Sequence, residues 1–198
     1  MKSINPEVVT RIPTKYGPFF IKAYHYLNDQ PNLAIHTEGL QTNKPVYVRI
    51  HSECMTGDVF GSSKCDCGEQ LDFSMKWIQK HEGVIIYLRQ EGRGIGLINK
   101  LHAYNLQEKG LDTKSANLEL GFHEDPRDYT PAIGILKDLK IDRIRLLTNN
   151  PMKVEAFEGS QIKVVERVPI EIEPRPENLF YLQTKKKGMR HMLSSKQL

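Results

Sequence analysis

The sequence has few cysteines, no long apolar run and no large excess of one charge. Its three cysteines are an odd number, so they cannot all pair in internal disulfides, and clustered cysteines in a reducing compartment more often bind metal or react. No segment approaches the roughly 20 apolar residues that a membrane-spanning helix needs. The first residues, MKSINPEVVTRIPTKYG, contain no apolar signal segment. We therefore expect a cytoplasmic protein with no membrane partner.

Composition favours a globular fold over a disordered chain. Hydrophobic residues make up 39% and charged residues 26% of the 198 positions, and there is no long biased tract. This length is enough for one domain with a substantial core, so we expect a single domain over residues 1–198. The net charge of +4 is mild for a nucleic-acid binder and suits an enzyme with a phosphate-bearing substrate equally well.

The N-terminal quarter predicts antiparallel β-structure. Residues 8–52 are rich in aromatic and β-branched residues, most clearly at Gly17–Tyr26 (GPFFIKAYHY) and Val46–Ile50 (VYVRI). The segments DQPN and TNKP between these strands predict turns.

From residue 70 onward, helices and strands alternate. Leu71, Met75 and Ile78 repeat at the spacing of one helix face, while Gly83–Leu88 (GVIIYL) is a continuous apolar run typical of a buried strand. Further helices are predicted at residues 96–109, at 131–139, from 151, and over about the last 20 residues. Further strands are predicted at residues 143–147 and 163–170. We therefore expect an α/β fold, with a mixed β-sheet covered by helices and a β-rich antiparallel N-terminal part.

The cysteines have the spacing Cys54-x10-Cys65-x-Cys67. Thiolates favour zinc among the common cellular metals. A structural zinc ion has four protein ligands, whereas a catalytic zinc ion has three and keeps one position for water. Because the chain has no fourth cysteine, the spacing predicts one catalytic zinc ion held by these three side chains.

Two alternatives remain open for the cysteines. His51, three residues before Cys54, would complete a structural site. The cysteines would otherwise be buried without a ligand, although Cys-Asp-Cys-Gly beside a turn is unusual for a core. Three thiolates also leave a Zn²⁺ site with a net charge of about −1, so a base nearby is needed to activate water at neutral pH.

A glycine-rich loop follows the buried strand and opens a helix. Residues 89–96 read RQEGRGIG, and a helix N-terminus after such a loop offers backbone N–H groups to phosphate. Arg89 and Arg93 add charge-assisted contacts. The loop fits neither the Rossmann nor the Walker pattern. The alternative is a tight turn that needs glycine only for its backbone conformation.

Two further segments carry polar groups of interest. Residues 122–129, FHEDPRDY, contain three carboxylates, a histidine and an arginine, which in isolation are typical of a solvated loop. Residues 148–153, TNNPMK, follow a predicted strand at its carboxyl end, where open α/β sheets bind ligands.

Together these segments resemble the GTP cyclohydrolase II family, the enzymes that begin riboflavin biosynthesis. The matching stretches, in the family's order, are RIHSEC, GDVFGSSKCDCG, RQEGRGIGL, KLHAYNLQEKGLDT, AN, LGF, the D-x-R-D of residues 125–128, LLTNNPMK and VERVPI. They span about residues 12–193. One departure is EGSQIKV at residues 158–164, which lacks the family's usual alanine-glycine turn. Many members are fused to a dihydroxybutanone phosphate synthase domain, for which this chain is too short.

The resemblance implies a hydrolase that opens the guanine imidazole ring of GTP. It implies release of formate and pyrophosphate, a zinc ion on Cys54, Cys65 and Cys67, Mg²⁺ with the triphosphate, and a homodimer. It also implies that Asp125 is the proton acceptor and that Arg127 is the nucleophile at the α-phosphate. The GTP-binding residues that it implies are Arg49, Ile50, His51, Ser52, Glu53, Gln70, Glu91, Gly92, Arg93, Thr113, Thr148 and Lys153. A guanidinium with a pKa above about 12 is a poor nucleophile, so a phosphate clamp stays open for Arg127.

Two other functions fit single features. His51-Ser52-Glu53 matches the H-x-E of zinc nucleobase deaminases, but their P-C-x-x-C partner motif is absent. A zinc-stabilised nucleic-acid module would use the basic run Lys185-Lys186-Lys187, but such modules normally have a fourth zinc ligand. We therefore expect no nucleic-acid partner.

Overall fold

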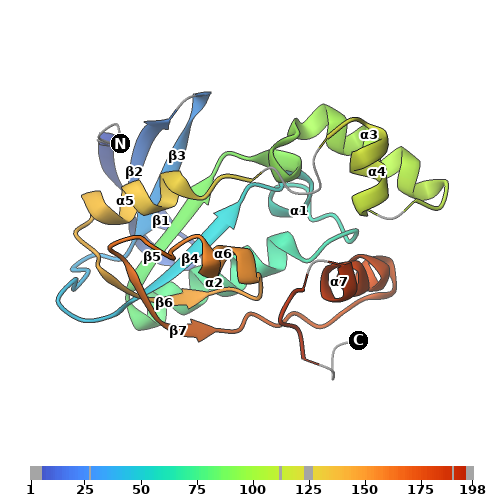
Figure 1. Cartoon of the computed structure of the whole chain (residues 1–198). Coiled ribbons are helices and arrows are strands. Elements are labelled where there is room, and N and C mark those ends of the chain that lie inside the picture. The colour runs from blue at the N-terminus through green and yellow to red at the C-terminus, as the bar shows by residue number, and fades with distance from the viewer. Residues whose placement is uncertain (1–5, 27, 112, 123–126, 189, 195–198) are drawn as a thin grey trace. The chain divides into compact units, whose positions relative to one another are not determined.

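A seven-stranded sheet runs through the computed structural model in the order β1-β2-β3-β5-β4-β6-β7 (Figure 1). The structure describes residues 6–26, 28–111, 113–122, 127–188 and 190–194. The strands are β1 (Pro6–Thr14), β2 (Gly17–Tyr26), β3 (Asn28–His36), β4 (Val46–Ser52), β5 (Gly83–Leu88), β6 (Arg143–Leu147) and β7 (Lys163–Val168).

The sheet is mixed. Strands β1, β2, β3 and β5 pair antiparallel in that order, whereas β6 runs parallel to both β4 and β7. The β1–β2 hairpin turns at Lys15 and Tyr16, and Gly17 directly after the turn has a φ of 123°, a conformation that L side chains rarely adopt. The predicted α/β fold, with a mixed sheet and an antiparallel N-terminal part, is confirmed.

Strand β5 shows why an uninterrupted apolar run is needed at the centre of this sheet. Alternate side chains of a strand point to opposite faces. Val84 and Ile86 join the larger hydrophobic cluster, which includes residues of α5 (Thr130–Asp138). Ile85 joins a second cluster with residues of α2 (Cys67–His81). Because both faces of β5 are covered, both sets of alternating positions have to be apolar.

The chain divides into two compact units. The sheet unit comprises residues Met1–His51, Leu71–Arg89 and Tyr129–Ile170, and includes α5 and α6 (Pro151–Glu155). The helical unit comprises Ser52–Gln70, Gln90–Asp128 and Glu171–Leu198. Its elements are α1 (Met55–Asp58), the 3-10 helix η1 (Glu91–Gly94), α3 (Gly96–Glu108), α4 (Thr113–Glu119) and α7 (Pro176–Gly188). The extent of the predicted domain, residues 1–198 with a core of about 12–193, stays a prediction.

Two sequence predictions are wrong in detail. The segment DQPN, predicted as a turn, begins β3, because pairing with β2 at Tyr26↔Asn28 and Tyr24↔Asn32 overrides its local turn preference. The helix predicted over the last 20 or so residues starts earlier, with a proline suited to a first helical turn, and the described residues beyond it, 190–194, are not helical. Among the described residues, no helix has the length and apolar character to cross a membrane.

Candidate metal centre

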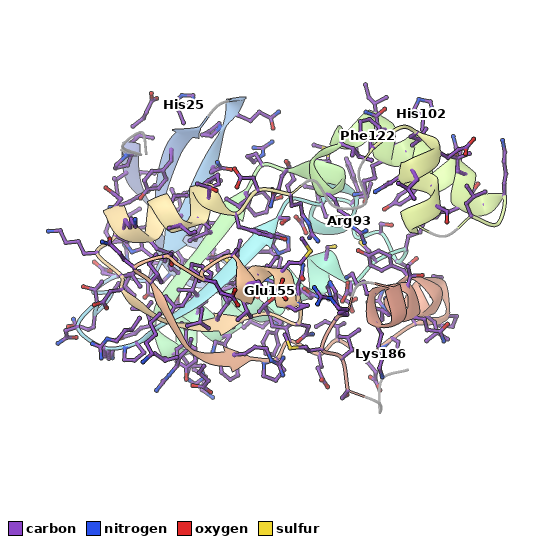
Figure 2. The ribbon with its side chains drawn as sticks, viewed as in Figure 1. His25, Arg93, His102, Phe122, Glu155 and Lys186 are labelled. Carbon is purple, nitrogen blue, oxygen red and sulfur yellow. The ribbon has the colours of Figure 1, made fainter. Side chains whose placement is uncertain are left out.

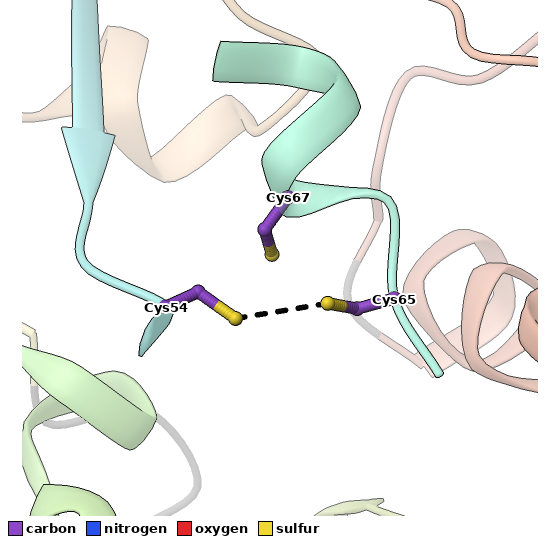
Figure 3. A group of neighbouring side chains, drawn as sticks. All are labelled: Cys54, Cys65 and Cys67. Carbon is purple, nitrogen blue, oxygen red and sulfur yellow. Dashed lines mark hydrogen bonds between the residues drawn. The ribbon is translucent and has the colours of Figure 1, made fainter. Parts of the chain in front are cut away.

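Three cysteine side chains converge at one point of the helical unit (Figure 3). Cys54 follows β4 and caps the start of α1, Cys65 lies in the loop before α2, and Cys67 is the first residue of α2. Their sulfur atoms all lie within 4.8 Å of one another, and the Sγ atoms of Cys54 and Cys65 are 3.6 Å apart. The spacing in the sequence thus becomes a cluster in space, as predicted.

Two glycines let the segments that bear these cysteines approach each other. A Cβ added at Gly68 would lie 2.3 Å from the carbonyl oxygen of Gly57, a distance that real Cβ atoms essentially never show. A Cβ added at Gly57 would lie 2.9 Å from the sulfur of Cys65 and 3.3 Å from that of Cys54. The start of α2 and helix α1 therefore pack backbone to backbone, and larger residues at either position would push the thiols apart.

A buried lysine lies beside the sulfurs. The Nζ of Lys100, on α3, donates to the Sγ of Cys54 at 3.2 Å and to the Oε1 of Glu91 at 2.8 Å. Lys100 and Glu91 are each 9% exposed. Glu91 also accepts from the backbone N–H of Met55 at 2.5 Å, at the first residue of α1. The carboxylate thus links the lysine to the helix that follows Cys54.

The surroundings of the thiols set their ionisation. Hydrogen bonds from Cys65 and Cys67 lower the pKa of Cys54, while burial acts in the opposite direction. The hydrogen bond to Cys54 raises the pKa of Cys65 to about 11, and it also raises the pKa of Cys67. Burial alone would lower the pKa of Lys100, but the charges of Cys54 and Glu91 outweigh burial and raise it. The cluster therefore favours the thiolate form of Cys54, which Lys100 faces as an ammonium.

The cluster fits a soft divalent metal ion. Two thiolates bound at about 2.3 Å in a tetrahedral arrangement have sulfurs about 3.8 Å apart, close to the observed separation of Cys54 and Cys65. Among the described residues, the group of possible metal ligands contains these three cysteines and no histidine, so His51 does not complete it. His51 instead lies in β4, 2% exposed, with its ring stacked on that of Tyr87 at 5.4 Å between centroids.

The glycine-rich loop folds into η1 with an unusual backbone. Gly92 and Arg93 both have φ near +60°, the left-handed region, which costs a non-glycine residue such as Arg93 about 1 kcal/mol. The N–H groups of Gly92, Gly94 and Ile95 donate to acceptors within residues 90–92. These three donors are committed inside the loop. The side chain of Arg93 is labelled in Figure 2, and one of its guanidinium nitrogens is buried with no hydrogen-bond partner among the described residues. Phosphate binding by this loop stays a prediction.

Five residues predicted to bind GTP lie in the sheet unit. Arg49, Ile50, His51, Thr148 and Lys153 are each 5% exposed or less. The Nζ of Lys153 donates to the carbonyl oxygen of Ile50 at 2.8 Å, so the structure brings these two predicted residues together. A guanidinium N–H of Arg49 donates to the carbonyl oxygen of Leu147, the last residue of β6.

The TNNPMK segment has a structural role besides any contact with a ligand. The Oδ1 of Asn150 accepts from the N–H of Met152 and caps α6, with Pro151 at its first turn. The Oδ1 of Asn149 accepts from the N–H of Ile170. The two asparagines thus have structural roles, and a role of Thr148 and Lys153 in GTP binding stays a prediction.

The remaining predicted residues belong to the helical unit. The Nε2 of Gln70 donates to the Oδ2 of Asp66 at 2.5 Å, and the Oγ of Ser52 accepts from the Nε2 of Gln90 at 2.8 Å. Glu53 is 9% exposed and Arg127 is half-buried. Thr113 begins α4. Asp125 lies outside the described residues.

The GTP cyclohydrolase II family model matches residues 5–169 of this chain. The chain belongs to the GTP cyclohydrolase II family. A riboflavin biosynthesis protein RibBA from Chlorobium phaeovibrioides is 52% identical over 195 residues, which are 98% of this chain and 48% of that protein. RibBA from Bacillus cytotoxicus is 48% identical over 193 residues, 96% of this chain and 49% of that protein. This member of the family thus spans about half the length of these curated relatives.

A solved structure gives a more distant likeness. RibBX from A. baumannii, a two-domain 3,4-dihydroxy-2-butanone 4-phosphate synthase, aligns with a TM-score of 0.46 and 18% identity, over 87% of this chain and 41% of that one.

Two lysines of the site were missed by sequence reasoning. Helix α3 buries Lys100 and Ala103, whereas Ile98 is 72% and Leu101 45% exposed, the reverse of an ordinary amphipathic helix. Lys185 is 8% exposed on α7, in the basic run that a nucleic-acid module would have used. The inversion in α3 is one of burial, so only the structure shows it, and only the structure shows which groups pair with the two lysines.

Proposed function

We propose that this chain has GTP cyclohydrolase II activity: it hydrolytically opens the guanine imidazole ring of GTP and releases formate and pyrophosphate. The product is a diaminopyrimidinone that carries the ribosylamino 5′-phosphate, and the reaction begins riboflavin biosynthesis. The observation that carries the proposal is the convergence of three thiols beside a buried ammonium, in a chain of this family.

In this proposal Cys54, Cys65 and Cys67 hold one zinc ion. The ion supplies Lewis acidity and a bound water at neutral pH. Three thiolates and Zn²⁺ have a net charge of about −1, and the ammonium of Lys100, 3.2 Å from the Sγ of Cys54, offsets it. Lys100 thereby compensates for the weak activation of water that three thiolates alone would give.

The proposal assigns the triphosphate and base of GTP to cationic and polar side chains. Arginine and lysine bind phosphate oxygens through charge-assisted hydrogen bonds, and Mg²⁺ shares the charge of the triphosphate. The assigned residues are Arg49, Ile50, His51, Ser52, Glu53, Gln70, Glu91, Gly92, Arg93, Thr113, Thr148 and Lys153. Glu91 has a second duty, since its carboxylate already bonds Lys100 and Met55.

Asp125 takes the role of proton acceptor, and Arg127 acts at the α-phosphate. We favour covalent attack by Arg127, because Asp125 and Asp128 flank it and Asp125 is placed in sequence to accept its proton. A guanidine nitrogen of Arg127 bonds to the α-phosphorus and gives its proton to Asp125, while the bond to the bridging oxygen breaks and pyrophosphate leaves with the electron pair. Water then hydrolyses the guanylyl–arginine, which restores Arg127 and leaves the 5′-phosphate on the product. As a clamp, Arg127 would only orient the phosphate while water attacks it.

Trapping separates these two roles of Arg127. A Cys54→Ser chain, deficient in ring opening, is quenched during incubation with GTP, and its peptides are analysed by mass spectrometry. A guanylyl mass on the Arg127 peptide is expected. Pyrophosphate accumulating past one equivalent without that mass would establish the clamp.

The proposal extends to a cytoplasmic homodimer with GTP as its small-molecule substrate.

Product analysis tests the proposed GTP cyclohydrolase II activity against the deaminase alternative. The purified chain is incubated with GTP, Zn²⁺ and Mg²⁺, and formate, pyrophosphate and ammonia are measured. We expect equal amounts of formate and pyrophosphate and no ammonia. Ammonia without formate would establish a deaminase. The absence of both formate and ammonia would overturn the proposal.

A further inference from the structure

Helix α7 is tied to the loop that bears two of the three metal ligands. Asp66, the residue between Cys65 and Cys67, accepts through its Oδ1 from the Nζ of Lys185 on α7 at 2.8 Å. The two residues are 119 positions apart in the sequence. Asp66 is 3% and Lys185 8% exposed, so the pair is buried. A charged pair removed from water in this way persists only where both partners are held in place.

Helix α7 buries one of its faces, as a helix packed against the rest of its unit does. Asn178, Leu182 and Lys185 lie at i, i+4 and i+7, one face of a helix, and all three are buried. Near the start of α7, the Oδ1 of Asn178 accepts a hydrogen bond from the N–H of Arg175 at 2.8 Å. The guanidinium of Arg175 also pairs with the carboxylate of Glu69, two residues beyond Cys67. Two ion pairs therefore join this C-terminal segment to residues 66–69.

The carboxylate of Asp66 has a second partner with a bearing on function. Its Oδ2 accepts from the Nε2 of Gln70, one turn along α2. Because both carboxylate oxygens are held, the side chain of Asp66 is fixed, and so is the backbone that presents Cys65 and Cys67 on either side of it. The family match ends at residue 169, so Arg175, Lys185 and the whole of α7 lie beyond it.

We propose that Lys185 is a positioning residue for the metal centre: through its buried ion pair with Asp66, α7 holds the Cys65–Cys67 loop in the geometry that binds the ion. This inference rests on the proposed zinc site and is independent of the identity of the substrate. Lys185 touches none of the ligand sulfurs in this role and acts through Asp66.

Zinc affinity is the measurement that tests this proposal, by competition with a chromogenic chelator in the absence of GTP. Lys185→Met keeps the length of the side chain and removes the charge, and we expect it to weaken zinc binding about 10- to 100-fold, the usual effect of losing an outer partner of a metal ligand. Lys185→Arg, which keeps the charge, should recover most of the affinity. Lys186→Met is the matched control, because the Nζ of Lys186 (Figure 2) donates to the carbonyl oxygen of Ser194 instead. It should stay within about twofold of the wild type.

A double-mutant cycle distinguishes positioning through Asp66 from a general effect on folding. Asp66→Asn combined with Lys185→Met removes both charges, so no uncompensated carboxylate is left buried. If the single variant Lys185→Met does not fold, zinc affinity is measured on this double variant instead. We expect the double variant to bind zinc no more weakly than the weaker single variant. Losses that multiply, or wild-type affinity in Lys185→Met, would overturn the inference. A wild-type chain that binds no zinc would overturn the zinc site itself, together with this inference.

Discussion

Lys100 places a positive charge beside the three cysteines of the candidate metal centre. A lysine is rarely buried without a partner, and here it has two, the sulfur of Cys54 and the carboxylate of Glu91. Contacts among the three thiols lower the pKa of Cys54 and raise the pKa values of Cys65 and Cys67, and a metal ion binds the thiolate form. Metal binding is thus expected to release protons and to weaken in acid.

Replacing Cys54 separates metal chemistry from nucleotide binding. Cys54→Ser removes the thiolate nearest Lys100, so we expect zinc affinity to fall more than about 100-fold and formate release to be lost. GTP binding should remain, because the residues assigned to the triphosphate do not depend on this sulfur. Calorimetric titration with GTP and chelator competition with zinc measure the two effects. A folded Cys54→Ser chain that binds no GTP would show that the ion also organises the nucleotide site.

Helices α1 and α2 bring the three cysteines together because Gly57 and Gly68, where the two helices meet, have no side chains. Their contact at Gly57 and Gly68 is closer than any Cβ permits, and the sequence hides this, because GDVFG and CDCG read simply as turns. The elements themselves were easier to predict. Strand β5 and helix α2 carry local apolar patterns, whereas the contact between Gly57 and Gly68 depends on the tertiary fold.

Gly68→Ala tests this close packing. The added methyl group would lie 2.3 Å from the carbonyl oxygen of Gly57, so helices α1 and α2 must separate. We expect unfolding free energy to fall by about 1–3 kcal/mol, as for overpacked cores, together with weaker zinc binding. Gly61→Ala is the control, because nothing lies within 4 Å of its added Cβ. Its left-handed φ of 64° should cost about 1 kcal/mol in stability and leave zinc affinity unchanged. Equal zinc affinity in both variants would contradict the account.

Strand β3 gives the sheet unit a dependence on pH. Burial lowers the pKa of His36 below 6.5, more strongly than its hydrogen bond to the carbonyl oxygen of Thr37 raises it. The folded state therefore favours the neutral ring, which stacks on Phe20. The stability that this provides is present above pH 6.5 and is lost as the pH falls through the lowered pKa, because the unfolded chain binds the proton more readily.

The variant His36→Phe isolates this effect, since it keeps a stacked ring and removes the titrating group. Urea unfolding of both chains between pH 7 and pH 5 measures it, and the wild type should lose more stability than the variant. Identical pH dependence in the two chains would show that burial does not set the ionisation of His36.

At the scale of the whole molecule, local patterns predicted far more than distant pairings. Most strands and helices followed from periodicity within short windows, and the clustering of the three cysteines followed from their spacing. Lys100 and Lys185 did not, because their partners Cys54 and Asp66 are 46 and 119 residues away, and a lysine in a helix is ordinarily solvated. The turn predicted at DQPN was wrong for a different reason: pairing with the preceding strand β2 overrides the local turn preference and makes this segment part of β3.

The central claim is that one metal ion on three cysteines carries the ring opening of GTP. The most direct measurement is a zinc titration: the chain is freed of metal with a chelator, zinc is added back in known amounts, and formate release from GTP is measured at each addition. The account predicts almost no formate without zinc and a linear rise that stops at one zinc per chain. Full formate release from the metal-free chain would contradict it.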